Sequence, residues 1–221
     1  MFSKLELRKK VDLVDRGLGA EIFSGIVNGI GAIFALVALI LVIVYAVNKG
    51  GKALVLCAIF YGVVLFLVNL FSCLYHSLAY NDGKRVFRVL TITLVHFLFT
   101  SCIALLTYRL MRNNFVLITG ISFGISMLSL MFNFINFEKF RYVRIFGFLL
   151  QVLVALYVAY FSLALLPGTA FGLLIVAFIA FFASFVFHIF GYQLSYLNSV
   201  GHIVLQVGNV FLFFAILLYV I

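Results

Sequence analysis

The chain has 221 residues, of which 67% are apolar and 10% are charged, and its formal net charge is +9. A soluble domain is roughly half apolar and about a quarter charged, and its interior is too small to bury so many apolar residues. The composition therefore excludes a soluble globular protein, a disordered chain and a collagen-like chain, and it indicates an integral membrane protein.

The first 23 residues form a basic segment ahead of the first apolar run. Leu7, Val11, Val14 and Leu18 recur in it at helical spacing, opposite a charged face. This pattern predicts a short amphipathic helix that lies on the membrane surface. The segment lacks the apolar core of a signal peptide, so we expect no cleavage and interpret the first apolar run as a true membrane span.

Seven uninterrupted apolar runs follow, and each is long enough to cross a bilayer as a helix. The predicted spans are residues 24–47, 53–80, 89–111, 115–136, 145–166, 170–192 and 199–221. The connections between them are too short to hold a soluble domain. The sequence thus predicts an all-α membrane bundle over residues 24–221, with any functional site inside the bundle.

Positive charges fall mainly on one side of this predicted bundle. The N-terminal segment and the connections at 81–88 and 137–144 hold most of the 15 Lys and Arg residues. The positive-inside rule therefore predicts a cytoplasmic N-terminus and an external C-terminus. Because no basic domain stands apart from the spans, we expect contacts with membrane lipids and no binding of nucleic acid. The six acidic residues all fall outside the predicted spans.

All four histidines lie inside the predicted spans, at positions 76, 96, 188 and 202, whereas no Asp or Glu does. Ionisable groups are costly in lipid, so their placement is the main functional signal. With the predicted topology, His76, His96, His188 and His202 all lie in the cytoplasmic half. This pattern fits a pocket or a metal site at that end, or hydrogen bonds that only hold the helices together.

The fourth span carries a polar stripe through the whole membrane. The stripe consists of Thr119, Ser122, Ser126, Ser129, Asn133 and Asn136. Gly120 and Gly124 add a GxxxG element beside it, for which close helix packing is predicted. Small polar stripes usually join helices, and a water-lined path is the alternative interpretation.

Three segments stand out as a set: LFSCLYHSLAYNDGKRVFRVLT at 70–91, EIFSGIVNGIGA at 21–32 and LNSVGHIVLQVGNVFLFFAILLYV at 197–220. They resemble the hemolysin III proteins and, more distantly, the progestin and adipoQ receptors. These families belong with the alkaline ceramidases in a superfamily of seven-span membrane proteins. The resemblance covers essentially the whole chain, and it implies a multi-pass protein of the bacterial cell membrane.

The resemblance also implies a zinc site at the cytoplasmic end. In the family, a His of the second span and two His of the last span bind zinc, with a Ser and an Asp close by. By this comparison His76 is the first ligand, Ser72 is its partner, and His202 is one of the last-span ligands. The other last-span ligand falls on Asn198, and the Asp falls on Thr91. We therefore take Ser72 and Thr91 as the positions of catalytic side chains.

These positions include departures from the family pattern. Asn198 is a poor zinc ligand beside His, Thr91 cannot act as a carboxylate, and a first-span His falls on Asn28. His188 is the better substitute as a third nitrogen. His96 lies roughly 140° around its helix from Thr91, so both side chains cannot face one site.

The hypothesis that follows is a hemolysin III-like membrane protein with a degenerate or rearranged zinc site, for which a lipid is the expected substrate or ligand. One alternative is a zinc-dependent hydrolase that cleaves an amide bond of a lipid. The other is a pore or transporter with hemolytic activity, for which the stripe of the fourth span is the support.

Overall fold

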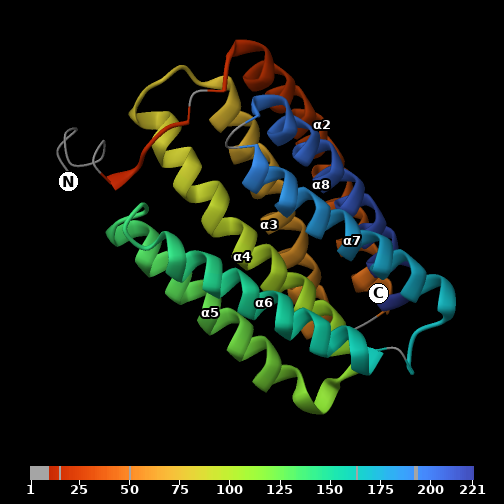
Figure 1. Ribbon diagram of the computed structural model, residues 1–221. Coiled ribbons are helices and arrows are strands. Elements are labelled where there is room, and N and C mark those ends of the chain that lie inside the picture. The colour runs from red at the N-terminus through yellow and green to blue at the C-terminus, as the bar shows by residue number, and fades with distance from the viewer. Residues whose placement is uncertain (1–9, 15, 50, 163, 192–193) are drawn as a thin grey trace.

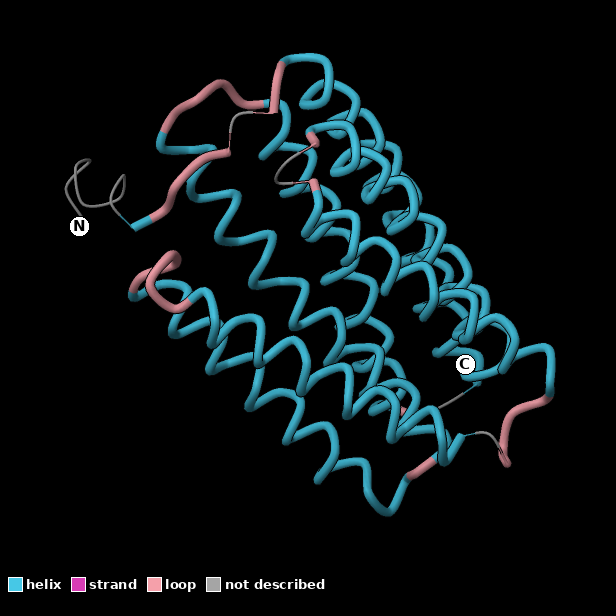
Figure 2. Tube along the Cα trace, viewed as in Figure 1, coloured by secondary structure: helices cyan, strands magenta, loops and turns pink. Residues whose placement is uncertain are grey.

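The computed structural model describes residues 10–14, 16–49, 51–162, 164–191 and 194–221. Within these residues the chain forms helices joined by short connections and contains no strand (Figures 1 and 2). Seven of the described helices are long and apolar enough to cross a membrane, which confirms the predicted all-α bundle. They are α2 (Leu18–Lys49), α3 (Lys52–Ser77), α4 (Asp82–Leu110), α5 (Phe115–Ile135), α6 (Arg141–Ser162), α7 (Gly168–Phe190) and α8 (Ser195–Ala215), the last continued by a π-helical turn, Ile216–Val220.

Helix α4 lies between two groups of helices (Figure 1). On one side α3 packs between α4 and α2, and α8 packs against both α2 and α7. On the other side α5 and α6 pack against each other and against α4. The main apolar core lies among α2, α3, α4 and α8, where buried alanines such as Ala35, Ala38 and Ala58 allow close approach.

We call the end of the bundle at which α2 begins the basic end; it lies at the upper left of Figure 1. The α3–α4 and α5–α6 connections also lie there, with Lys84, Arg85, Arg88, Arg141 and Arg144 in or beside them. Helix α4 begins seven residues before the predicted span, because the Asn81 side chain caps it by accepting a hydrogen bond from the amide of Lys84. That this end faces the cytoplasm remains a prediction from the charge pattern.

The predicted surface helix before the first span is wrong where the structure describes it. Residues 11–14, 16 and 17 are not helical, and α2 begins at Leu18 rather than at Ser24; the predicted position Leu7 lies outside the described residues. Arg85 and Arg88 donate hydrogen bonds to the backbone carbonyls of Val11 and Asp12, which are then unavailable to a helix. We call residues 10–14, 16 and 17 the N-terminal strap, because they cross the basic end and pack on α4.

The polar stripe of the fourth span joins α5 to its neighbours. Oγ1 of Thr100 in α4 lies 2.9 Å from Oγ of Ser122 and 2.8 Å from Oγ of Ser126. Gln151 of α6 donates to the Ser126 hydroxyl at 2.9 Å and accepts from the Ser122 hydroxyl at 2.7 Å. These four side chains are fully buried, so this part of the stripe holds helices together.

The close packing predicted for Gly120 and Gly124 is wrong. A Cβ atom at either position would meet no described atom within 4 Å. The two glycines are on parts of α5 that are not covered by another helix, and α5 instead contacts α4 and α6 through its serines.

Candidate functional site

Two histidines from distant parts of the chain meet at the basic end. His76 lies in the last turn of α3, and His202 lies near the start of α8. Their Nε2 atoms are 3.0 Å apart, and both side chains are buried. The structure therefore brings together the two histidines that the resemblance assigns to zinc.

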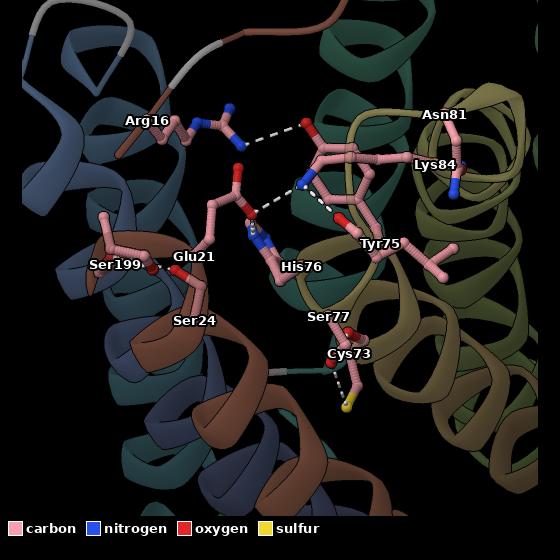
Figure 3. Close-up of polar contacts among 12 residues, drawn as sticks. Arg16, Glu21, Ser24, Cys73, Tyr75, His76, Ser77, Asn81, Lys84 and Ser199 are labelled. Carbon is pink, nitrogen blue, oxygen red and sulfur yellow. Dashed lines mark hydrogen bonds and ion pairs between the residues drawn. The ribbon is translucent and has the colours of Figure 1, made fainter. Parts of the chain in front are cut away.

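A carboxylate that the sequence placed outside the membrane spans lies in this site. Glu21 belongs to the first turn of α2, and its Oε2 atom is 2.7 Å from Nδ1 of His76 (Figure 3). Glu21 is part of this helix because α2 starts at Leu18, six residues before the predicted span. Glu21, Ser24 and Asn28 are all buried on one face of α2, and their helical spacing was a signal for this placement.

Lys84 of α4 completes this polar group. Its Nζ atom is 3.1 Å from Oε2 of Glu21 and donates to the backbone carbonyl of Leu78 at 3.2 Å. The ammonium group also lies over the Tyr75 ring, 4.9 Å from its centroid. Figure 3 shows Glu21, His76 and Lys84 directed toward one another from three helices. Removal of either charge from such a buried pair would leave the other without compensation.

His188 is the third imidazole of the site. Its ring centroid is 4.7 Å from that of His202, and its Nδ1 atom donates to the Ser184 backbone carbonyl at 2.7 Å. The Nε2 atom of His188 therefore keeps its lone pair. His96 lies elsewhere, with its ring 6.3 Å from that of Phe148 in α6. The structure thus places His188 beside the pair and His96 away from it.

The other predicted site residues, Ser72, Asn198 and Thr91, make no described hydrogen bond with the histidine pair. Ser72 is buried one turn before His76 on α3, and Asn198 is buried one turn before His202 on α8. Both amide atoms of Asn198 are buried without a hydrogen-bond partner in the described residues. The Thr91 hydroxyl also lacks a partner there and makes no hydrogen bond with His76.

The donor groups fit a zinc ion in part. Two imidazole nitrogens bound to tetrahedral zinc at about 2.0–2.1 Å lie about 3.3 Å apart, close to the 3.0 Å between the Nε2 atoms of His76 and His202. Nδ1 of His76 is engaged by Glu21, as is typical of zinc-binding histidines. Across the described ranges, however, no three His, Cys, Asp or Glu side chains are yet grouped to hold a metal. A third ligand therefore requires His188 to move toward the pair.

A cavity of about 520 Å³ opens beside the site, between α7 on one side and α4 and α6 on the other. Of the described helices, α8 is the one that packs along α7, so the side of α7 next to α6 is covered only locally. The wall is mostly aromatic and aliphatic, and it includes Ser184 and His188. A volume of this size and an apolar wall are typical of sites for small apolar ligands.

A second hollow lies between α2 and α3 and has a volume of about 790 Å³. Glu21, His76 and Lys84 form part of its wall, together with Gly25 and Gly29 of α2. The hollow between α2 and α3 therefore gives access to Glu21, His76 and Lys84. The α4–α6–α7 cavity gives access to His188 instead.

Two curated bacterial proteins are similar to this chain over nearly its whole length. Hemolysin-3 of Bacillus cereus is 28% identical over 222 residues, which cover 97% of this chain and 98% of that protein. The Hemolysin-3 homolog of Bacillus subtilis (strain 168) is 23% identical over 204 residues, or 90% of this chain and 93% of that protein.

These two relatives support the interpretation of the chain as a divergent hemolysin III family member. No protein-family model matches it, and no solved structure gives a significant match. The seven helices that are long and apolar enough to span a membrane, together with the Bacillus relatives, support a multi-pass bacterial membrane protein.

Proposed function

We propose that the basic end of this hemolysin III-like protein contains a rearranged zinc site, and that a membrane lipid binds next to it in the α4–α6–α7 cavity. His76 and His202 are two ligands, and His188 takes the place that Asn198 cannot fill. The observation that carries the proposal is the contact between the two Nε2 atoms at 3.0 Å, with Glu21 on the opposite nitrogen of His76.

The protein's own side chains prepare the imidazoles for this role. Glu21 accepts a hydrogen bond from the Nδ1–H group of His76, so the lone pair of this ring is on Nε2, which faces His202. The Ser184 carbonyl orients His188 in the same way. Lys84 compensates the charge of Glu21, so that the carboxylate is not left alone in the membrane interior.

Binding of a lipid is better supported than hydrolysis of its amide bond. A bound zinc ion would supply a Lewis acid and an activated water, and hydrolysis would then need a carboxylate near that water. Thr91 has no carboxylate, and Glu21 contacts the nitrogen of His76 that faces away from His202. Release of fatty acid from an amide-linked lipid, abolished by a chelator, would establish the hydrolase alternative instead.

The zinc content of the purified protein tests this proposal. Elemental analysis of the wild-type protein in detergent should find about one zinc per chain, and His76→Ala and His202→Ala should each remove it. His96→Ala is the matched control, because His96 is also a buried histidine but makes no contact with the pair. Its zinc content should equal that of the wild type.

The role of His188 separates a rearranged site from a degenerate one. His188→Ala should lower zinc affinity in a chelator competition while the fold is retained. A wild-type protein without zinc, or with zinc that survives loss of both His76 and His202, would refute the proposed site.

A further inference from the structure

Among the described residues, one cation lines the α4–α6–α7 cavity, and it has no described partner acid. Arg144, in the first turn of α6, donates through Nη1 to Oδ1 of Asn133 at 3.1 Å and to the Phe137 carbonyl at 2.7 Å. Its guanidinium lies over the Phe137 ring, 3.8 Å from the centroid. No described carboxylate lies within 4.0 Å of it; Glu138 pairs with Arg88 instead. The geometry fixes Arg144 and leaves its Nε and Nη2 donors available to a ligand.

An unpartnered histidine lines the same cavity close to Arg144. His96 of α4 is 1% exposed, and its Nδ1 atom has no hydrogen-bond partner in the described chain. The ring lies against Gly147, where a Cβ atom would be 3.6 Å from Cε1 of His96. Arg144 and Gly147 are three residues apart on α6, so their positions are neighbours on the surface of this helix, and Arg144 and His96 line the same cavity.

The rest of the cavity is apolar and suits a hydrocarbon chain. Phe148 of α6 stacks on Phe185 of α7, with centroids 4.9 Å apart, and Phe99 of α4 lies against Phe148 at 5.2 Å. Arg144 is one turn from Phe148, on the side of the basic end. A lipid in this cavity would therefore place its chain among the aromatic rings and its headgroup at Arg144.

We infer that Arg144 and His96 form a subsite for the anionic headgroup of a membrane lipid, whose chain occupies the α4–α6–α7 cavity. This inference rests on the lipid binding in the proposed function, but it requires neither zinc nor turnover. A guanidinium recognises a phosphate or a carboxylate through paired hydrogen bonds, and His96 supplies a further polar contact. A neutral lipid leaves the charge of Arg144 without compensation, and in a zwitterionic lipid the headgroup cation weakens the attraction of its phosphate to Arg144, so we expect selection against both.

Native mass spectrometry of the intact protein in detergent tests this inference. The protein is titrated with phosphatidylglycerol, oleate and phosphatidylcholine, which carry a phosphodiester, a carboxylate and a zwitterionic headgroup. Wild-type protein should bind at least one of the two anionic lipids at least about tenfold more tightly than phosphatidylcholine. Whichever of phosphatidylglycerol and oleate binds more tightly shows whether the subsite prefers a phosphodiester or a carboxylate.

Two variants separate the subsite from general surface charge. Arg144→Gln should remove the preference, whereas Arg141→Gln, an exposed cation in the same turn of α6, should retain it. Equal loss in both variants, or full retention in Arg144→Gln, would overturn the inference. A wild-type protein that bound all three lipids equally would overturn it as well.

A wild-type measurement covers the case in which Arg144→Gln does not fold. An anionic lipid with a photoreactive group in its chain should crosslink to α6 and α7 near Phe148 and Phe185, and Ala159→Phe, which fills the cavity, should reduce this crosslinking. Crosslinks confined to other helices would refute the site. Zinc content measured on the same samples shows whether the zinc proposal stands or fails separately.

Discussion

At the scale of single residues, each imidazole at the basic end has a different partner, and the partner decides what the ring can do. His76 contacts Glu21 through one nitrogen and His202 through the other. Nδ1 of His188 donates to a backbone carbonyl, and Nδ1 of His96 is buried with no hydrogen-bond partner among the described residues. The first two patterns are typical of rings that bind a metal, while the last leaves a ring nitrogen for the ligand that we propose.

Glu21→Gln should lower zinc affinity about 10- to 100-fold, because a carboxamide is a weaker partner for Nδ1 of His76 than a carboxylate. A chelator competition with purified protein measures this change. Asp82→Asn serves as the control, since Asp82 is an acid near the same end that pairs with Arg85 rather than with a histidine. Unchanged affinity in Glu21→Gln would show that Glu21 does not act on a metal ligand.

At the scale of helices, two polar networks hold the bundle together. Thr100, Ser122, Ser126 and Gln151 join α4, α5 and α6, whereas Gln206 of α8 donates to Asn69 of α3 at 2.6 Å. The first network includes Ser122 and Ser126 of the polar stripe, for which a water-lined path was the alternative interpretation of the sequence. Because these hydroxyls are buried and bonded to neighbouring side chains, the structure supports the packing role of this part of the stripe.

Gln151→Leu should destabilise the protein by about 1–2 kcal/mol, since it removes several interhelical hydrogen bonds that are each worth roughly 0.6 kcal/mol in a membrane. Reversible unfolding in mixed micelles measures the difference. Thr119→Val, which removes a single contact to Thr107 at 3.2 Å, should cost less than half as much. An equal cost for the two variants would contradict a clamp centred on Gln151.

At the scale of the whole molecule, most of the described positive charges, the histidine pair and the N-terminal strap lie at the basic end. The strap is fixed to α4 by Arg85 and Arg88 and to the α5–α6 connection through the amide of Glu138, which donates to the Lys10 carbonyl at 3.1 Å. The α4–α6–α7 cavity opens beside the same site. This arrangement places the proposed lipid and zinc sites at one membrane face.

Alkaline phosphatase fused after Ile221 should be active in cells, because the charge pattern predicts an external C-terminus and the enzyme folds only outside the cytoplasm. The same reporter inserted after Lys139, at the basic end, should be inactive. The reverse result would invert the topology and would place the histidine site on the external face.

Several features of the fold and site were readable from local sequence. Each apolar run gave a helix, because length and hydropathy decide whether a segment can cross a bilayer. His76 and His202 were paired by resemblance, and the structure brings them into contact. The surface helix predicted for the N-terminal strap was wrong, because Arg85 and Arg88 of α4 donate hydrogen bonds to backbone carbonyls that a helix would need. These arginines are distant along the chain, so local sequence does not show the contact.

The sequence by itself determined that the chain is a bundle of seven membrane-spanning helices with histidines at one end, because hydrophobic length and charge are local properties. Only the tertiary structure decided that Glu21 and Lys84 meet at His76, that His188 lies beside His202, and that Arg144 lines a cavity with His96. These contacts join helices that are distant along the chain. Which faces meet depends on how the whole bundle packs, and helical periodicity alone does not fix that packing.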